Sequence, residues 1–415
     1  MAEQGAAVKA FDPAVLQRIT DTLNDAVDQG AVSGFVTLIW RSGEVVQLNT
    51  PGLCNVERGL PMQRDSLFRI ASMTKPIVSL AALMLIEEGR LSLRDPISKW
   101  LPEFTEMRVL IDPVGPLDQT YPAPRQITVE DLMLHRAGLA YSFSAAGPLG
   151  RAYDAELGPS LASPLTPDQW LAKLAALPLI YPPGHHMHYS HATDVLGFLL
   201  GRLEGKTLGE VLWTRIFEPL GMKDTAFWLP PEKRDRLAHL YTRPPAGGPL
   251  KDVSLPMGDE PHPFEGGGGG LISSLDDYLT FARLMLGGGE VDGVRLVKPT
   301  TMALMLTDRL TPAQHQFSFL GLPYWEGMGF GLGVSVILDS EKHQVLGAGA
   351  DGSFGWPGAF GTWWQADPEN EMIMIYMVQD SVTLSAEVIT GARAVVVSRT
   401  ALSAFQKLTY EALKA

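Results

Sequence analysis

The sequence predicts an α+β fold, in which one antiparallel sheet is built from both ends of the chain and flanked by an N-terminal and a C-terminal helix. Two observations predict it. The segments Asp12–Asp28 and Ser385–Leu413 have the spacing of amphipathic helices, and strand-like runs follow the first and precede the second. From about Pro102 to His262 strands are hard to find, and the periodic segments are helical. We therefore expect a mostly helical domain inserted into a sheet domain.

The predicted domain boundaries follow this change of pattern. Residues 1–101 and 266–415 form a discontinuous sheet domain, and residues 102–265 form the inserted helical domain. The active site is expected between the two.

The first part of the chain begins with the helix Asp12–Asp28, which ends before Gly30. The runs Gly34–Trp40 and Glu44–Leu48 then predict two strands joined by a turn at Ser42-Gly43.

In the middle of the chain, apolar periodicity predicts four helices: Val129–His135, Thr166–Ala176, Thr193–Glu204 and Leu208–Phe217. The last part opens on five consecutive glycines, residues 266–270. No Gly-Lys-Ser/Thr follows them, so close backbone packing is favoured over a phosphate-binding loop. A helix and four strand-like runs complete this part: Leu275–Leu286, then Gly331–Leu338, Gln344–Leu346, Ala359–Gln365 and Met372–Val378.

Composition argues against several classes of function. The formal net charge of the 415 residues is −13, which argues against nucleic acid or an anionic membrane as a partner, because both attract basic surfaces. Cys54 is the single cysteine, so no disulfide within the chain can form. The N-terminus has no signal-peptide pattern, and no stretch approaches the ~20 apolar residues of a transmembrane helix. We expect a cytoplasmic protein, and the sequence leaves its oligomeric state open.

The segment Ser72-Met73-Thr74-Lys75 is the most informative about chemistry. It opens an apolar run, Pro76–Ile86, which predicts a helix ending at Gly89. Residues three apart share a helix face, so Ser72 and Lys75 are expected side by side. A serine hydroxyl becomes a good nucleophile when a neighbouring group takes its proton, and a lysine can assist. The four-residue pattern alone is weak, because it recurs by chance.

A second cluster, residues 181–191, allows two interpretations. Four histidines, the last of them His191, suggest metal ligands. However, no Cys, Asp or Glu lies among them and no familiar zinc spacing appears, so no metal site is expected. The alternative is that Tyr189 acts as a general base assisted by Lys75. Taken alone, Tyr189 could equally be a buried core tyrosine.

Together with their surroundings, these segments resemble the serine β-lactamase and penicillin-binding-protein-like hydrolases, closest to the class C β-lactamase-like branch and the family VIII carboxylesterases. The resemblance runs from about residue 15 to residue 400. The segment Ile127–Leu139 is similar to the family signature I-T-x-x-x-L-L-x-H-x-S-G-L, with Ala137 at the position where the family usually has serine. The resemblance rests on an ordered set of segments: Phe68–Lys75, Ile127–Leu139, Pro183-Gly184, Tyr189-Ser190-His191, Pro219–Met222, and the glycine run leading to Leu271–Ser274. It implies an α/β sandwich of the β-lactamase type.

Two departures from the family pattern bear on the substrate. His191 stands where the second motif, Y-x-N, usually has asparagine. Trp356-Pro357-Gly358 stands where the third motif usually reads Lys-Thr/Ser-Gly, and this W-x-G form resembles esterase members. The lysine helps to bind the carboxylate of a β-lactam, and its loss removes a charge-assisted contact worth ~1.5–3 kcal/mol. We therefore expect small to medium uncharged esters as substrates.

The resemblance implies the mechanism of a serine carboxylesterase. Tyr189, poised by Lys75, removes the proton of Ser72, and Ser72 Oγ attacks the ester carbonyl. The backbone N–H groups of Ser72 and Ala359 stabilise the oxyanion. Water then hydrolyses the acyl-enzyme, and no cofactor is needed.

Aromatic side chains near these motifs are expected to form an apolar acyl or alcohol pocket. The predicted substrate-binding residues are His191, Trp356, Gly358, Tyr141 and Phe143. Further candidates for the same pocket are Tyr324, Trp325, Phe354, Phe360, Trp363 and Trp364. Three alternatives stay open: β-lactamase or D-amino-acid peptidase activity, acyl transfer to an alcohol, and a binding or sensor domain that is acylated without turnover.

Overall fold

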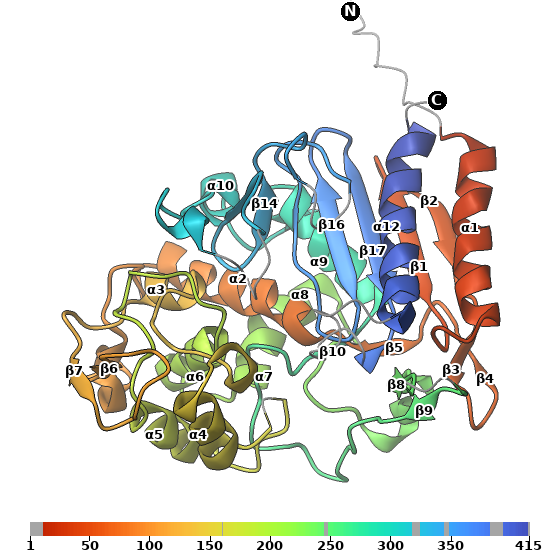
Figure 1. Ribbon diagram of the computed structural model, residues 1–415. Coiled ribbons are helices and arrows are strands. Elements are labelled where there is room, and N and C mark those ends of the chain that lie inside the picture. The colour runs from red at the N-terminus through yellow and green to blue at the C-terminus, as the bar shows by residue number, and fades with distance from the viewer. Residues whose placement is uncertain are drawn as a thin grey trace, which may run out of the picture.

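The computed structural model describes residues 11–159, 161–244, 248–317, 324–343, 348–381 and 393–413. In this part of the chain, the central sheet has seven antiparallel strands in the spatial order β13-β14-β15-β16-β17-β1-β2 (Figure 1). The strand bounds are β1 Val36–Arg41, β2 Glu44–Asn49, β13 Met328–Phe330, β14 Ser335–Ile337, β15 Phe354–Gly355, β16 Trp363–Asp367 and β17 Met372–Met377. Strands from both chain ends thus share one sheet, which confirms the predicted α+β class.

Strands β1 and β17 join the two ends of the chain. Leu38 lies opposite Ile375, and Ile39 lies opposite Met374. Because successive side chains point to opposite faces, Leu38 and Ile375 enter the main hydrophobic core. Ile39 and Met374 enter a second core beneath the terminal helices. Since both faces are covered, β17 is apolar throughout instead of alternating with polar residues.

Helices cover both faces of the sheet. α1 and α12 lie side by side on one face (Figure 1), where Ile19 and Phe405 share the second core. Asp12 caps α1, because its side chain accepts a hydrogen bond from the Ala14 N–H (2.8 Å). α9 packs against β16 and β17. The helix bounds are α1 Pro13–Asp28, α2 Thr74–Glu87, α3 Val129–Met133, α4 Pro148–Leu157, α5 Pro167–Ala175, α6 Ala192–Glu204, α7 Leu208–Leu212, α8 Glu218–Leu220, α9 Leu275–Leu286, α10 Pro299–Leu306 and α12 Arg393–Leu413.

The middle of the chain is mainly helical and shares its core with the sheet part. Ile77 of α2, Leu196 of α6 and Phe330 of β13 all belong to one hydrophobic cluster. Short strand pairs accompany the helices here and elsewhere: β3 Leu53–Asn55 with β4 Leu60–Pro61, β5 Leu67–Arg69 with β10 Ile272–Ser274, β6 Arg108–Leu110 with β7 Thr120–Pro122, β8 Tyr241–Thr242 with β9 Lys251–Asp252, and β11 Glu290–Val291 with β12 Val294–Arg295.

Two predicted strands are wrong in their first halves. Of the run Gly331–Leu338, only Ser335–Ile337 is a strand, β14. The run Ala359–Gln365 differs in the same way. Residues 359–361 form a turn, and β16 begins only at Trp363. The turn is closed by a hydrogen bond from the Gly358 N–H to the Thr362 carbonyl (2.7 Å). Gly361, with φ of 86°, supplies the left-handed conformation that such a turn requires. Helices α4 and α10 and strand β13 were not predicted.

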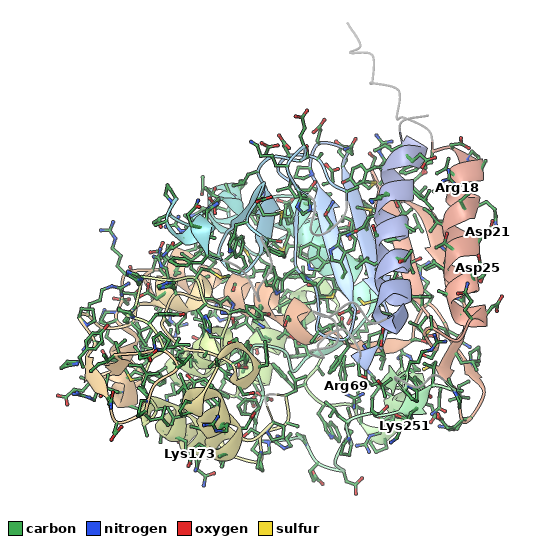
Figure 2. All side chains as sticks on the ribbon, in the orientation of Figure 1. Arg18, Asp21, Asp25, Arg69, Lys173 and Lys251 are labelled. Atoms are coloured by element: carbon green, nitrogen blue, oxygen red, sulfur yellow. The ribbon has the colours of Figure 1, made fainter. Side chains whose placement is uncertain are left out.

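Two predicted segments fall partly or wholly outside the described residues. These are the run Gln344–Leu346 and residues 385–392 of the C-terminal helix, of which Arg393–Leu413 is described as α12. Figure 2 shows Arg18, Asp21 and Asp25 along α1 and Lys173 on α5, toward opposite ends of the molecule. None of the helices described here is long and apolar enough to cross a membrane.

Candidate active site

Ser72 and Lys75 meet at the start of α2, as their spacing predicts. Ser72 lies in a 3-10 turn, Ala71–Met73 (η1), that leads into the helix. Lys75 Nζ donates a hydrogen bond to Ser72 Oγ (3.1 Å) and another to the carbonyl of Gly268 (2.5 Å). Lys75 is 1% exposed, whereas Ser72 is half-buried. Ala71 has φ of 45°, a conformation rarely adopted by residues with a Cβ, so the backbone just before Ser72 is strained.

The strand pair β5–β10 brings the glycine run to this serine. Arg69 pairs with Ile272, and the Ile70 N–H donates to the Leu271 carbonyl (3.0 Å). The five glycines before Leu271 therefore lie against the start of α2. A Cβ added to Gly268 would lie 2.7 Å from both an Asp194 carboxylate oxygen and the Tyr141 hydroxyl. Close backbone packing, the favoured interpretation of this run, is confirmed.

Gly268→Ala is expected to lower kcat by ~10–100-fold, because misplacing a catalytic group by about 1 Å can cost that much. The new methyl group would displace the Gly268 carbonyl that holds Lys75. Steady-state kinetics on a p-nitrophenyl ester would measure the effect. Gly258→Ala is the matched control, because its Cβ would meet its nearest neighbour only at 3.5 Å. A folded Gly268→Ala variant with wild-type kcat would contradict the importance of this carbonyl.

Tyr189 lies beside Lys75, just before α6. Lys75 Nζ is 4.5 Å from the centre of the Tyr189 ring and 5.6 Å from that of Tyr141. Trp356 Nε1 donates a hydrogen bond to the Tyr189 hydroxyl (3.2 Å). The structure thus brings together Ser72, Lys75, Tyr189 and Trp356 from three distant stretches of sequence and buries the last three almost completely.

The third motif, Trp356-Pro357-Gly358, follows β15 and packs against the nucleophile segment. A Cβ on Gly358 would lie 2.5 Å from the Ile70 carbonyl, so only glycine fits this approach. Thr362 Oγ1 donates to the same carbonyl (3.3 Å). Ala359 packs in a small apolar cluster that contains Ala71, the residue before Ser72.

The other predicted substrate-binding residues differ in their surroundings. Tyr141 is 5% exposed, with its ring centre 5.4 Å from that of Tyr189. Phe143 is 54% exposed and stacks on Tyr141 (5.0 Å). His191 is buried, and its Nδ1 lies 2.7 Å from Asp194 Oδ2. Its role in substrate binding stays a prediction.

The remaining aromatic candidates fall into two groups. The first group lies near Trp356 or Ala71: Tyr324 packs against Trp356, Trp325 packs against Tyr324, and Phe360 shares a cluster with Ala71. Phe354 and Trp364 pack against each other, and Trp364 also packs against Tyr278 and Phe281 of α9. Trp363 belongs to the core beneath the terminal helices. Phe354, Trp363 and Trp364 are therefore core residues.

His135 is a site neighbour to which the sequence interpretation gave no role. Its ring centre lies 4.7 Å from that of Tyr189. Burial, with smaller contributions from Lys75 and His188, lowers the pKa of His135 well below its ordinary value, so the imidazole is neutral. The Ser190 N–H donates to His135 Nδ1 (3.3 Å), which places the proton on Nε2. Its place in the family signature segment Ile127–Leu139 is the sequence signal that could have indicated His135 as a site residue.

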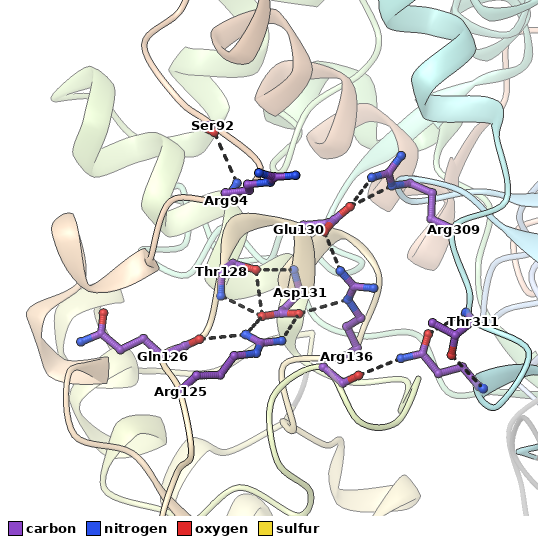
Figure 3. Close-up of polar contacts among 12 residues, drawn as sticks. Ser92, Arg94, Arg125, Gln126, Thr128, Glu130, Asp131, Arg136, Arg309 and Thr311 are labelled. Atoms are coloured by element: carbon purple, nitrogen blue, oxygen red, sulfur yellow. Dashed lines mark hydrogen bonds and ion pairs between the residues drawn. The ribbon is translucent and has the colours of Figure 1, made fainter.

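A network of charged side chains fixes α3 just before His135 (Figure 3). The fully buried Asp131 accepts hydrogen bonds from Arg125 (2.5 and 2.9 Å) and Arg136 (3.1 Å). Although burial opposes it, these bonds and those from Thr128 hold the pKa of Asp131 below its ordinary value. Glu130 accepts from Arg136 (2.6 Å) and from Arg309 (2.9 Å), which lies in the last part of the chain. The network therefore ties the helical region to the sheet part.

The Nδ1 atoms of His185 and His186 lie 2.7 Å apart, whereas His188 and His191 contact other residues. His188 Nε2 lies 3.1 Å from Ser144 Oγ, and burial lowers the pKa of His188 to about 4. His191 contacts Asp194, as described above. Among the described residues, three potential metal ligands converge only at Glu57, His239 and Asp252, where His239 already contacts Asp252 at 2.6 Å.

Comparison with known proteins places this geometry in a family. The sequence profile of the Beta-lactamase family matches residues 19–397. The chain belongs to the beta-lactamase family. Protein Rv1367c of Mycobacterium tuberculosis is 46% identical over 396 residues, which cover 94% of this chain and 98% of that protein. Esterase EstB of Burkholderia gladioli is 31% identical over 369 residues, which cover 84% of this chain and 86% of that protein.

A solved structure shares the fold of this chain. EstCE1, a hydrolase with promiscuous acyltransferase activity, superimposes with a TM-score of 0.77 at 27% identity, covering 94% of this chain and 98% of its own. The resemblance predicted from the motifs, including its closeness to family VIII esterases, is confirmed. The chain is an enzyme of the serine hydrolase or acyltransferase type.

Proposed function

We propose that this protein is a serine carboxylesterase that hydrolyses small to medium uncharged carboxylic esters through an acyl-enzyme on Ser72. The observation that carries the proposal is the continuous set of contacts from Ser72 Oγ through Lys75 to Tyr189 and Trp356. It supplies a nucleophile, a general-base system and an uncharged residue at the position where lactam-binding relatives have a cation.

Acylation uses Lys75 and Tyr189 together as the base. Ser72 gives its proton to this pair while Oγ attacks the ester carbonyl carbon. The tetrahedral intermediate collapses, the bond to the alcohol oxygen breaks, and the pair returns the proton to the leaving alcohol. A water molecule then attacks the acyl-enzyme, gives a proton to the same pair, and Ser72 leaves with that proton.

The backbone N–H groups of Ser72 and Ala359 form the oxyanion hole in this proposal. The first helical hydrogen bond is donated by the Met73 N–H to the Ile70 carbonyl (3.1 Å), so the Ser72 N–H lies in the first turn, where amides are free to bind a ligand. Ala359 shares a small cluster with Ala71, which places it next to the nucleophile segment. Each donor of such a hole typically contributes ~10²–10³-fold to the rate.

The preference for uncharged acyl groups is supported by the apolar side chains beside Ser72. Leu240 and Phe360 are buried against Ala71, and further aliphatic side chains at the edge of the same cluster are half-buried: Leu161, Val253 and Leu255. Trp356 adds an indole where relatives that bind a carboxylate have lysine. This surface favours an aliphatic acyl chain over a charged one.

A chain-length series of p-nitrophenyl esters run beside nitrocefin tests the proposal. Each buried methylene contributes ~0.8 kcal/mol, so kcat/KM should rise from acetate to medium acyl chains before the apolar surface is filled. The best ester should exceed nitrocefin by at least ~10-fold, the factor expected for the missing cationic contact. Ser72→Ala is the blank. Faster turnover of nitrocefin than of every ester would overturn the assignment.

Acyl transfer to an alcohol is the second candidate, because EstCE1 combines hydrolysis with acyltransferase activity. Product analysis with butanol added to the ester reaction separates the two. Free acid as the main product supports hydrolysis, and a butyl ester as the main product supports transfer.

A further inference from the structure

We propose that Asp194, held in place by His191, is a positioning residue that fixes Lys75 against Ser72. The inference rests on the proposed function, in which Lys75 belongs to the general base. It gives His191 a different task from the substrate contact predicted for the second motif, and it gives Asp194 a role that no sequence motif indicated.

A line of three short contacts connects His191 to Lys75. His191 Nδ1 lies 2.7 Å from Asp194 Oδ2. The other carboxylate oxygen, Oδ1, accepts a hydrogen bond from the Gly268 N–H (2.7 Å). The carbonyl of the same glycine accepts from Lys75 Nζ (2.5 Å). The Gly268 carbonyl therefore holds Lys75, while Asp194 holds the Gly268 N–H.

Gly268 is held in place by contacts from outside the glycine run, and the Asp194 carboxylate is one of them. Asp194 and the Tyr141 hydroxyl both approach within 2.7 Å of where a Cβ would lie. A Cβ added to the neighbouring Gly267 would lie 2.6 Å from the Thr193 carbonyl. Glycines have the most conformational freedom of any residue, so a run of five requires external contacts to hold one carbonyl in place.

The environment of Asp194 holds its carboxylate in one position. Asp194 is 1% exposed and lies in the first turn of α6, where a helix N-terminus favours negative charge. A buried carboxylate is tolerated when each oxygen has a donor, and here Gly268 and His191 supply one each.

The His191 ring is itself enclosed by aromatic side chains. The ring centres of Tyr141, Trp170 and Tyr153 lie 4.3, 5.2 and 6.1 Å from it. A histidine at this position, where relatives usually have asparagine, thus gives Asp194 a rigid donor.

The test compares Asp194→Ala with Asp194→Asn. Alanine removes the acceptor of the Gly268 N–H, so kcat should fall by ~10–100-fold while KM changes by less than about threefold, because the loss affects the orientation of the base and not substrate binding. Asparagine keeps Oδ1 as an acceptor and should restore kcat to within about fivefold of wild type. Wild-type kcat in Asp194→Ala, or an Asp194→Asn variant as slow as Asp194→Ala, would overturn the inference.

Asp277 provides the matched control. It is also a buried carboxylate in the first turn of a helix, but it accepts from the Asp224 N–H (2.7 Å) and Thr225 Oγ1 (2.8 Å). Asp277→Asn should lower the melting temperature without changing kcat of the folded enzyme. An equal loss of kcat in Asp277→Asn would show that the Asp194 effect is a general loss of stability, which also overturns the inference.

The rate at which a fluorophosphonate labels Ser72, followed by mass spectrometry, separates this inference from the proposed function. Labelling needs an activated serine but no ester substrate. Fast labelling of wild type without ester turnover would refute the esterase proposal and leave the positioning inference standing. Equal labelling rates in wild type and Asp194→Ala would refute the positioning inference and leave the esterase proposal standing.

Discussion

Replacing Ser72 by alanine is expected to reduce ester hydrolysis by at least ~10³-fold, because the remaining oxyanion hole and binding contacts cannot form an acyl-enzyme. Ser72 Oγ accepts a hydrogen bond from Lys75 and fills no part of the core, so the fold should persist. Initial rates on a p-nitrophenyl ester and the melting temperature measure the two effects.

Ser79→Ala is the matched control for this substitution, because Ser79 lies on α2, the helix that follows Ser72, is 1% exposed and stands outside the catalytic contacts. It should keep ester hydrolysis near the wild-type rate. Residual activity near wild type in a folded Ser72→Ala variant would remove Ser72 from the role of nucleophile.

Tyr189→Phe is expected to lower kcat by ~10²–10³-fold with little change in KM, the range typical for losing a general base. The change removes only the hydroxyl that accepts a hydrogen bond from Trp356 and leaves the ring beside Lys75. Steady-state kinetics on the same ester would measure it.

Tyr153→Phe provides the comparison, because it removes an equally buried hydroxyl that accepts a hydrogen bond from the Ala140 N–H (3.3 Å). It should keep kcat within about twofold of wild type, since that hydroxyl is not part of the proposed base. A loss of well under tenfold in Tyr189→Phe would assign Tyr189 a structural role.

Much of the fold could be predicted because local pattern and tertiary packing agree. The apolar run Met372–Met377 forms a strand covered on both faces, and Leu275–Leu286 forms a helix with the predicted bounds. Helices α4 and α10 were missed although each begins with a proline at its first position, which is a recognised start signal. The turn at 359–361 was missed because its residues resemble the strand that follows them.

From the sequence alone, only site residues that lie close together in the chain could be paired. Ser72 and Lys75 are three residues apart, so helix geometry alone pairs them. Tyr189 and Trp356 required the resemblance, because tertiary packing alone brings them near Lys75. The hydrogen bond from the Gly268 N–H to Asp194 could not be predicted, because an aspartate is common in the first turn of any helix. Similarly, the hydrogen bond between Trp356 and Tyr189 depends on side-chain positions that spacing does not encode.

Trapping the acyl-enzyme shows directly whether Ser72 carries the acyl group. The enzyme is mixed with a p-nitrophenyl ester, quenched in acid, digested and analysed by mass spectrometry. The acyl mass is expected on the peptide that contains Ser72 and is expected to be absent from Ser72→Ala. Cys54 is the single competing thiol of the chain, and burial raises its pKa to about 11, so it should stay unmodified. An acyl group on Cys54 or on any residue other than Ser72 would contradict the account.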